Sequence, residues 1–200
     1  MDHINQVDTM CGRFSTSTLP INILNGLSVS VRHWESRDQV YPKDDVNVVF
    51  RDESNEITLM KWGWERSFSP RPLINTRGLE AWTKKTWAQA IQERRCIIPA
   101  KAFYEWDENQ PKGKRDRYRI SSTQDDGFAM GGLYEINKDG ELFMSILTTL
   151  PNEKMSKIHH RMPVILNEEN YEAWFTSTDR KEVEFMMKPL ADSQINIVKG

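Results

Sequence analysis

The sequence predicts one α+β domain built around an antiparallel, barrel-like β-sheet with flanking short helices. The chain has 200 residues, which is enough for a single substantial core. Short runs of β-branched and aromatic residues recur along it, and short amphipathic segments are dispersed among them. We therefore place the domain at residues 11–200 and expect residues 1–10 to be an N-terminal extension.

The strands of this sheet are predicted from apolar runs and from residues that alternate between apolar and polar. They are expected at residues 11–15, 46–50, 57–64, 96–98, 102–106, 115–120, 128–136, 142–148 and 163–166. The turn-like residues 137–140 predict a hairpin between two of them.

Four helices are predicted between and after these strands. The longest covers residues 79–94, where the apolar residues follow roughly helical spacing. The other three are expected at residues 153–157, 168–175 and 181–188, the last of which stops at Pro189. A loop punctuated by prolines covers residues 67–72.

The composition narrows the classes of partner. Hydrophobic residues make up 38% and charged residues 28%, which is typical of a soluble globular protein, and the formal net charge is −2. A protein that grips duplex DNA through many phosphates is usually basic, so nucleic-acid binding here must use a local patch. Seven Trp, eight Phe and five Tyr suit a core and also permit base stacking.

The sequence also bears on location and cofactors. No apolar run approaches the ~20 residues that cross a bilayer, and residues 1–10 have no apolar stretch, so neither a membrane partner nor a secretory signal is predicted. The two cysteines, Cys11 and Cys96, are too far apart for a disulfide framework or a zinc-ligand motif. We expect a cytoplasmic protein, nucleoid-associated when bound to DNA, with no cofactor and no metal.

Cys11 is the first candidate for chemistry. A cysteine at the start of a chain carries its amine and thiol on adjacent carbons. It can therefore condense with an aldehyde to an imine and then close a five-membered thiazolidine ring, whereas lysine could form only the imine. For an isolated cysteine beside Phe14, a structural role in the core is the more common explanation.

Glu105 is the second candidate, because it lies between Tyr104 and Trp106 in a strongly aromatic segment. A carboxyl buried there would have a raised pKa and would suit general acid catalysis. The alternation of a strand equally allows Glu105 to point to solvent while its neighbours pack.

His159, His160 and Arg161 offer imidazoles for proton transfer and a guanidinium for phosphate. Adjacent residues of a strand point to opposite faces, so a metal site made by the two histidines would be a chance arrangement. Two exposed polar residues are the simpler interpretation.

Two further groups could bind a nucleic-acid strand. Asn75 and Arg77 follow the proline-punctuated loop and could hydrogen-bond to phosphate oxygens. Arg115, Arg117 and Arg119 would project from one face of a strand and form an arginine stripe. A solvated loop and a charged hairpin edge explain both patterns as well.

These motifs occur together and in one order, and in that combination the chain resembles the SRAP family, whose name derives from SOS-response-associated peptidase. The resemblance spans residues 10–175. It rests on Cys11-Gly12-Arg13-Phe14, Trp62-Gly63, Asn75-Thr76-Arg77, Arg95-Cys96-Ile97-Ile98-Pro99-Ala100, Phe103-Tyr104-Glu105-Trp106, Gly132-Leu133-Tyr134-Glu135, Thr148-Thr149 and His159-His160-Arg161-Met162-Pro163.

The resemblance implies the barrel-like α+β fold and a basic cleft for single-stranded DNA. It also implies that an N-terminal Cys11 captures the aldehyde of an abasic site as a stable thiazolidine crosslink, which shields the lesion in the DNA damage response. Asn75 would hold the sugar or the cysteine backbone, and Glu105 would shuttle protons. His159 would act as acid and base on the deoxyribose and assist reversal of the crosslink.

By the same resemblance, the DNA-binding residues are Arg13, Trp62, Arg77 and Arg161, of which the arginines contact phosphates. The implied partner is single-stranded DNA that contains abasic sites. The protein is expected to be a monomer with no obligatory protein partner. AP-lyase-like activity and autoproteolysis by a thiol mechanism would accompany crosslinking.

Three features depart from the family pattern. The cysteine usually follows the initiator Met directly, whereas ten residues precede Cys11. With them attached, its nitrogen is an amide and cannot close the ring, so translation starts at Met10 or the extension is removed. The residue after the first histidine is usually Asp but is His160 here, which leaves the functional imidazole open between His159 and His160. The segment after Trp62-Gly63 also differs, which affects details of the DNA groove.

Two alternatives stay open from the sequence. In the first, the chain is a thiol peptidase of the N-terminal-nucleophile type: Cys11 attacks, Glu105 or His159 is the base, and the extension is a self-cleaved propeptide. In the second, the chain binds single strands without catalysis, through its aromatic residues and the arginine stripe.

Overall fold

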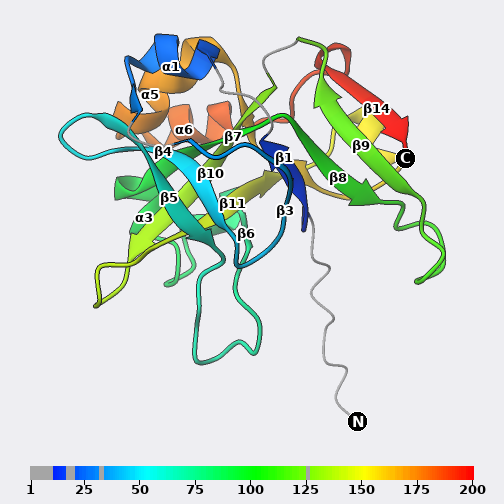
Figure 1. Cartoon of the computed structure of the whole chain (residues 1–200), viewed down its shortest axis with the longest axis horizontal. Helices are drawn as coiled ribbons and strands as arrows, with labels where there is room; N and C mark the ends of the chain where they lie inside the picture. Colours follow the sequence, from blue (N-terminus) through cyan, green and yellow to red (C-terminus); the bar gives the residue numbers. More distant parts are fainter. Residues whose placement is uncertain (1–10, 17–20, 32–33, 125–126) are drawn as a thin grey trace.

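The computed structural model describes residues 11–16, 21–31, 34–124 and 127–200, so the predicted extension lies outside the described residues. Its strands form two sheets, and short helices lie at the periphery (Figure 1). The smaller sheet has the order β14-β9-β8-β1-β3. These strands are β14 (Ile195–Lys199), β9 (Arg117–Ser122), β8 (Ala102–Trp106), β1 (Phe14–Thr16) and β3 (Arg37–Val40).

The larger sheet closes on itself. Its ring consists of β11 (Leu142–Thr149), β10 (Phe128–Ile136), β7 (Arg95–Ala100), β4 (Asp45–Arg51) and β5 (Asn55–Trp62). Neighbours in that order are antiparallel, and the ring closes where β5 pairs in parallel with β11, with Lys61 opposite Phe143. The predicted barrel-like α+β fold is confirmed, but the parallel closure was not predicted, because adjacent hairpins say nothing about which strands meet last.

Four short strands extend the larger sheet: β2 (Ser30–Val31), β6 (Asn75–Arg77), β12 (Met162–Pro163) and β13 (Ile165–Leu166). The predicted single strand at residues 163–166 is thus two strands on either side of Val164. Asn75 and Arg77 lie on a strand that pairs in parallel with β11, so the alternative interpretation of these residues as a solvated loop does not hold. Strands this short carry too little periodicity to be predicted from sequence.

Barrel strands are covered on both faces, which explains their continuous apolar runs. All six residues of β7 are buried. Cys96 and Ile98 belong to a core that also contains Phe14 and Trp62, whereas Ile97 belongs to a second core beneath the helices. Because successive side chains of a strand point to opposite faces, one strand supplies both cores.

The helices are α1 (Ile21–Leu27), α2 (Gly78–Ala81), α3 (Ala90–Glu93), α4 (Glu153–Ser156), α5 (Tyr171–Thr176) and α6 (Arg180–Met186), with 3₁₀ turns at Glu168–Asn170 and Asp192–Gln194. The long helix predicted at residues 79–94 is wrong, because turns separate α2 from α3. Between them, the ring of Trp87 packs against that of Trp64, with centroids 4.3 Å apart. The backbone N–H of Trp87 donates to the carbonyl of Lys84. Tertiary packing of the indole thus overrides a weak local helix preference.

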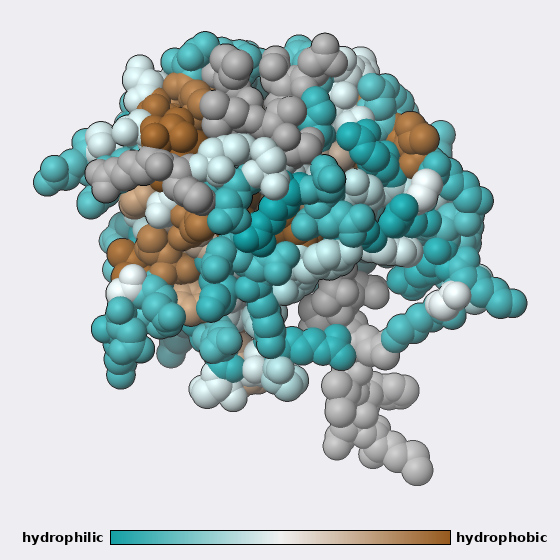
Figure 2. Space-filling view, viewed as in Figure 1, coloured by the Kyte–Doolittle hydropathy of each residue, from teal (hydrophilic) through white to brown (hydrophobic). Residues whose placement is uncertain are grey.

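The surface is mostly hydrophilic on the face shown in Figure 2, and hydrophobic residues gather toward the side on which α1 and α3 lie. Among the described residues, no helix combines the length and apolar character needed to span a membrane.

A buried arginine joins the helices to the barrel. Arg95 begins β7 and is 5% exposed. Its guanidinium donates to the carbonyls of Trp174 at 2.5 Å, Ile91 at 2.6 Å and Ser177 at 2.6 Å. These carbonyls belong to the ends of helical segments, which lack partners of their own. Burial lowers the pKa of Arg95, but the carbonyl oxygens hold the cation in place.

We expect Arg95→Met to lower the free energy of unfolding by roughly 2–4 kcal/mol, because it leaves several buried carbonyls without a donor. Urea unfolding measures the change. The neighbouring Arg94→Met, whose side chain forms only a 3.3 Å bond to Tyr134 and a surface ion pair with Glu93, is the matched control and should cost less than about 1 kcal/mol. Equal losses in the two variants would contradict this role of Arg95.

Candidate active site around Cys11 and Glu105

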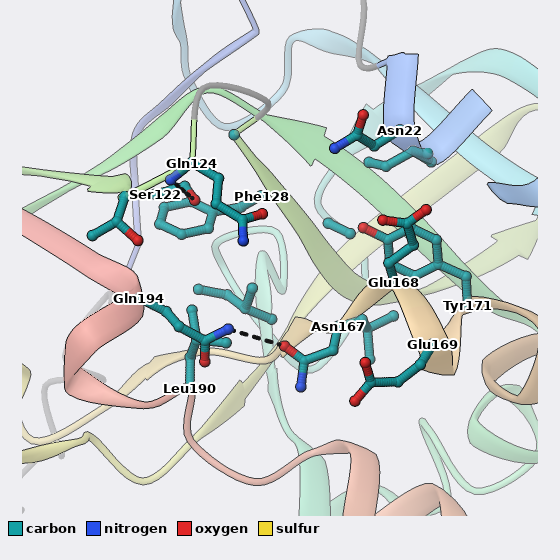
Figure 3. A pocket seen from close by; sticks show the side chains of 16 residues that line it. Asn22, Ser122, Gln124, Phe128, Asn167, Glu168, Glu169, Tyr171, Leu190 and Gln194 are labelled. Carbon is teal, nitrogen blue, oxygen red and sulfur yellow. Dashed lines mark hydrogen bonds between the residues drawn. The ribbon is translucent and has the colours of Figure 1, made fainter. Parts of the chain in front are cut away.

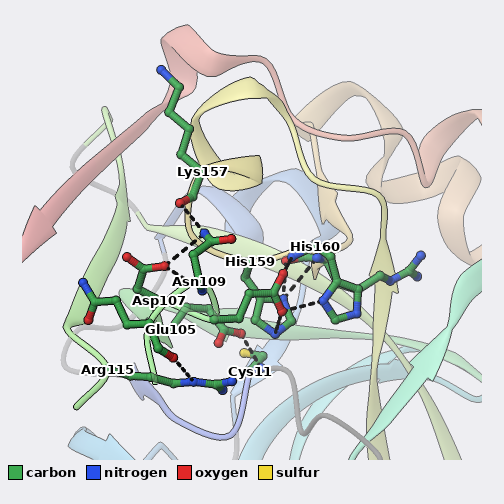
Figure 4. A network of polar contacts seen from close by, with 11 residues as sticks. Cys11, Glu105, Asp107, Asn109, Arg115, Lys157, His159 and His160 are labelled. Atoms are coloured by element: carbon green, nitrogen blue, oxygen red, sulfur yellow. Dashed lines mark hydrogen bonds and ion pairs between the residues drawn. The ribbon is translucent and has the colours of Figure 1, made fainter. Parts of the chain in front are cut away.

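The pairing of β1 with β8 brings Cys11 to Glu105. Phe14 lies opposite Phe103, and the N–H of Tyr104 donates to the carbonyl of Arg13 at 2.9 Å. The chain just before β1 therefore runs along β8, and the backbone N–H of Cys11 donates to Oε1 of Glu105 at 2.5 Å (Figure 4). Cys11 is fully buried and Glu105 is 3% exposed. Two residues 94 positions apart thus share one interior site.

Glu105 points inward, which decides between the two orientations left open by the sequence. Across β8 and β9, Glu105 lies opposite Tyr118, and Phe103 opposite Ile120. Burial raises the pKa of Glu105 to about 8, and the negative charge of Glu108 adds to the rise, whereas backbone N–H groups of Cys11 and Trp106 lower it. Around neutral pH, this carboxyl can therefore both give and accept a proton.

The thiol of Cys11 is held in its protonated form. Burial raises the pKa of Cys11 well above its ordinary value, and the adjacent Glu105 raises it further, against a small opposing effect of the Arg13 backbone N–H. A protonated thiol is a weak nucleophile. Any attack by Cys11 therefore needs a neighbouring base, and Glu105 is in contact with the same residue.

His159 and His160 lie in the loop between α4 and β12, not in a strand. Their rings stack with centroids 4.6 Å apart and an interplanar angle of 23°, so the expectation that they point to opposite faces is wrong. His159 is 4% exposed, whereas the side chain of His160 is 47% exposed. A loop can turn consecutive side chains to the same side, which a pleated strand cannot.

Glu108 connects the two imidazoles and was not singled out from the sequence. Its Oε2 lies 2.6 Å from Nδ1 of His160 and 3.5 Å from Nε2 of His159 (Figure 4). The backbone N–H of Glu108 donates to the carbonyl of Ile158 at 2.9 Å, which ties this turn to the histidine loop. Only tertiary structure joins these segments, and no local pattern around Glu108 signals it.

The basic residues Arg77 and Arg161 come together beside β11. Arg77 pairs with Thr148 across β6 and β11, and Nη2 of Arg161 donates to the carbonyl of Thr148 at 2.6 Å and to its Oγ1 at 3.0 Å. Burial lowers the pKa of Arg161, and the positive charge of Arg77 lowers it further. The carboxylate of Glu80, which pairs with Arg77 at 3.0 Å, opposes this lowering and already supplies one negative charge beside the two guanidiniums. Asn75 lies two residues from Arg77 on the same strand.

The outer face of the smaller sheet carries cations over aromatic rings. The guanidinium of Arg13 lies 5.2 Å from the ring centroids of Tyr41 and Tyr104, and that of Arg117 lies 5.6 Å from the ring centroid of Tyr104. Such stacks suit a flexible, negatively charged strand with planar bases.

Two predicted DNA-binding features have a different form in the structure. The arginine stripe keeps Arg117 and Arg119 on β9, but Arg115 precedes the strand and its Nε donates to the carbonyl of Gln110 at 3.4 Å. Trp62 is fully buried, donates to the carbonyl of Ile74 at 3.0 Å and packs on Phe14 at 5.0 Å between ring centroids. Its ring therefore has no exposed face on which a base could stack, and it packs against Phe14 of β1.

A separate cleft of about 240 Å³ lies between α1, the end of β9 and the 3₁₀ turns (Figure 3). Its polar lining includes Gln194, whose amide donates to Asn167 at 3.4 Å. It shares no lining residue with the site around Cys11 and Glu105.

The mixed β-barrel, and the contact inside it between the nitrogen of Cys11 and the buried carboxyl of Glu105, agree with the class of protein that the sequence motifs indicated. The sequence profile of the family described as SOS response associated peptidase (SRAP) matches residues 10–199, and the chain belongs to that family.

Relatives and solved structures agree with this assignment. The chain is 31% identical over 196 residues to the abasic site processing protein YoqW of Bacillus subtilis, covering 90% of this chain and 87% of that protein. It is 26% identical to the abasic site processing protein HMCES of Gallus gallus, over 69% of this chain and 51% of that protein. A crystal structure of a protein from Bacteroides thetaiotaomicron shares the fold, with a TM-score of 0.79, 23% identity and coverage of 94% and 91% of the two chains.

We expect Glu105→Gln to change how stability depends on pH. The folded pKa of about 8 lies above the ordinary value of 4.5, so protonated Glu105 favours the folded state. That contribution is complete below the unfolded pKa and is lost as pH rises through the folded pKa, by at most about 1.4 kcal/mol per pKa unit. Urea unfolding between about pH 5 and 9 should show the wild-type protein losing stability relative to Glu105→Gln.

Glu169→Gln, at an exposed position, is the control and should parallel the wild-type protein across the same range. A constant difference between wild type and Glu105→Gln would mean that Glu105 does not titrate there.

Proposed function

We propose that this protein processes abasic sites by capturing their aldehyde on Cys11 as a thiazolidine crosslink to single-stranded DNA. The observation that carries the proposal is the 2.5 Å contact between the nitrogen of Cys11 and Oε1 of buried Glu105. Membership of the SRAP family and the names of the relatives as abasic site processing proteins support it. The protein would act in the cytoplasm as a monomer on nucleoid DNA.

In the proposed reaction, the free amine of Cys11 attacks C1 of the ring-opened sugar to give a carbinolamine. Protonation of its hydroxyl by Glu105 or His159 releases one water and leaves an imine. The sulfur then adds to the imine carbon while its proton passes to carboxylate, and the nitrogen takes up a proton to become a ring amine. Glu105 suits both directions of transfer because its pKa of about 8 lies near neutrality.

The backbone at Cys11 favours a chain that begins there. With a preceding residue, Cys11 has φ of 43°, a left-handed conformation that costs a non-glycine residue about 1 kcal/mol or more. This torsion does not exist when no residue precedes Cys11. Removal of the extension would thus relieve the strain and convert the amide that faces Glu105 into the amine that the reaction requires.

Because the net charge is −2, the damaged strand would be bound by a local cluster of basic residues and not by a generally basic surface. Arg77 and Arg161 would hold phosphates on one side of the site, and Arg13 with Tyr104 would hold backbone and base on the other. Asn75 would orient the sugar, and Trp62 would act from beneath through Phe14. Single-stranded DNA fits because its bases are free to stack.

A chain that begins at Cys11 should form a heat- and detergent-stable adduct with single-stranded DNA that contains an abasic site. Gel electrophoresis under denaturing conditions measures it. Cys11→Ala should form none, because no sulfur closes the ring. Cys96→Ala should form the adduct normally, because Cys96 lies within β7 and has no free amine beside its thiol.

Absence of any stable adduct with the chain that begins at Cys11 would sink the proposal. If Cys11→Ala instead bound intact and abasic strands with the wild-type affinity, and wild type formed no crosslink, the chain would be a non-catalytic single-strand binding protein.

His159→Ala should slow formation and reversal of the adduct by about 10², the usual contribution of a positioned acid–base group. His160→Ala should affect these rates far less, because its side chain is 47% exposed whereas His159 is 4% exposed. Single-turnover rates with labelled DNA measure both variants. The opposite ranking would assign the chemistry to His160.

A second candidate function is autoproteolysis of the bond between Met10 and Cys11. The contact between Glu105 and Cys11 favours it. The carboxyl of Glu105 hydrogen-bonds to the nitrogen of Cys11, which would leave as an amine, and could protonate that nitrogen. The raised pKa of the Cys11 thiol works against it, because the sulfur would first have to lose a proton to another base.

Intact-mass measurement distinguishes the routes to the mature start. Self-cleavage predicts that Cys11→Ala and Glu105→Gln retain the extension. Loss of the extension from both variants would exclude self-cleavage and leave two sources of the free amine: a start at Met10 followed by removal of the methionine, or cleavage by another protease.

A further inference from the structure

The pair of stacked histidines beside Glu108 is the feature that the proposed chemistry does not fully use. The catalytic proposal needs one buried imidazole, yet His159 and His160 both meet the same carboxylate oxygen. One ring nitrogen of His159, one of His160 and a carboxylate oxygen of Glu108 all lie within 4.8 Å of one another. Two imidazole nitrogens and one carboxylate form a donor set that proteins use for Zn²⁺.

We propose that Glu108, His159 and His160 form a binding site for Zn²⁺, with at least one coordination position left to water. The sequence did not predict it, because consecutive histidines were expected on opposite faces of a strand. In the loop, the two rings stack on one side, 4.6 Å apart between centroids.

One donor–donor distance already matches a tetrahedral zinc site. Zinc–nitrogen and zinc–oxygen bonds of about 2.0–2.2 Å put two ligand atoms roughly 3.3 Å apart. Oε2 of Glu108 lies 3.5 Å from Nε2 of His159, which already meets this condition. The 2.6 Å hydrogen bond to His160 has to lengthen, and this half-exposed side chain has room to rotate.

Hydrogen bonds around the site position the proposed ligands before a metal ion binds. Two hydrogen bonds tie the turn that carries Glu108 to the histidine loop. The backbone N–H of Glu108 donates to the carbonyl of Ile158 at 2.9 Å, and the side-chain amide of Asn109 donates to the carbonyl of Lys157 at 3.0 Å. The N–H of His159 donates to the carbonyl of Met155 at 2.8 Å. Ligands that are positioned before the metal arrives lose less entropy on binding it.

Ring protons can rearrange without a net change. Nδ1 of His159 accepts from the backbone N–H of Arg161 at 3.1 Å and lies 3.3 Å from the carbonyl of the same residue. Coordination through Nε2 therefore requires the ring proton to move to Nδ1, where it would be donated to that carbonyl in place of the accepted bond. A backbone carbonyl on the second nitrogen is the usual support of a zinc-bound histidine. The proton that His160 now shares with Glu108 moves to its Nε2, and both imidazoles bind as neutral ligands.

The site also has a consequence for the proposed function. Only this consequence, and not the metal site itself, rests on that function. A zinc ion on Nε2 of His159 would remove that imidazole from proton transfer. Zinc would therefore inhibit capture of the abasic site, whereas Mg²⁺, which prefers oxygen ligands in octahedral geometry, would not.

Isothermal titration of the full chain with Zn²⁺ tests the site itself. We expect one ion per chain, and a loss of affinity of roughly tenfold or more in His160→Ala and in Glu108→Gln. The double variant His3→Ala/His33→Ala is the matched control, because it removes the other two of the four histidines and should bind as the wild type does. Unchanged affinity in His160→Ala, or no binding by the wild type, would overturn the proposal.

Co²⁺ substitution gives a second, independent readout. Ligands from nitrogen and oxygen should give visible bands of a four- or five-coordinate ion without sulfur charge transfer, and the bands should be lost in His160→Ala. A sulfur charge-transfer band would place the metal on a cysteine and overturn the proposed ligand set.

Crosslinking assays with and without Zn²⁺ then separate the two proposals. Inhibition by Zn²⁺ that is weaker in Glu108→Gln than in the wild-type protein, each measured against its own metal-free rate, supports both. Zinc binding that leaves crosslinking unchanged would keep the metal site and contradict the role of His159 in the reaction.

Discussion

The contact between the nitrogen of Cys11 and the buried carboxyl of Glu105 is the interaction on which the site depends. Burying a carboxyl costs free energy unless it is neutral, paired or hydrogen-bonded. Here backbone N–H groups of Cys11 and Trp106 hydrogen-bond to it, and its pKa rises to about 8. The nitrogen at the start of the domain therefore stabilises the acid, and the acid in turn fixes the position of that nitrogen. An ammonium group at Cys11 would strengthen the same contact whenever Glu105 is ionised, because a charge-assisted hydrogen bond is stronger than one from an amide.

The packing of the two sheets restricts movement at this contact. β1 lies between β8 and β3 in the smaller sheet, and its Phe14 packs on Trp62 of the barrel. Cys11 therefore stands where the two sheets share a core, and its backbone has few ways to move away from β8. The histidine loop is tied to the turn after β8 by the hydrogen bond from the Glu108 N–H to the carbonyl of Ile158. The same bond joins the loop that carries His159 and His160 to the turn that carries Glu108, so the three proposed metal ligands come from two segments that are tied together.

Much of the fold could be predicted from periodicity. The strands β4, β5, β8, β10 and β11 and the helices α5 and α6 agree with the predicted segments to within a few residues. Predictions failed where local signals are weak or are overridden. The apolar spacing across residues 79–94 indicates a helix, but the packing of Trp87 on Trp64 breaks it into turns. The parallel strands β2 and β6 have three residues or fewer, too short to show any period.

The sequence by itself determined the family and the chemical inventory: a cysteine near the start of the domain, an acid among aromatic residues, an imidazole and several arginines. It could not decide which way Glu105 points, because alternation permits both faces, and only the register of β8 against β9 turned it inward. It could not reveal Glu108 as a partner of the histidines, because their contact joins a turn and a loop about fifty residues apart. Residue types follow from the chain, but proximity, burial and the resulting pKa of Glu105 arise only when strands distant in sequence pair and exclude water.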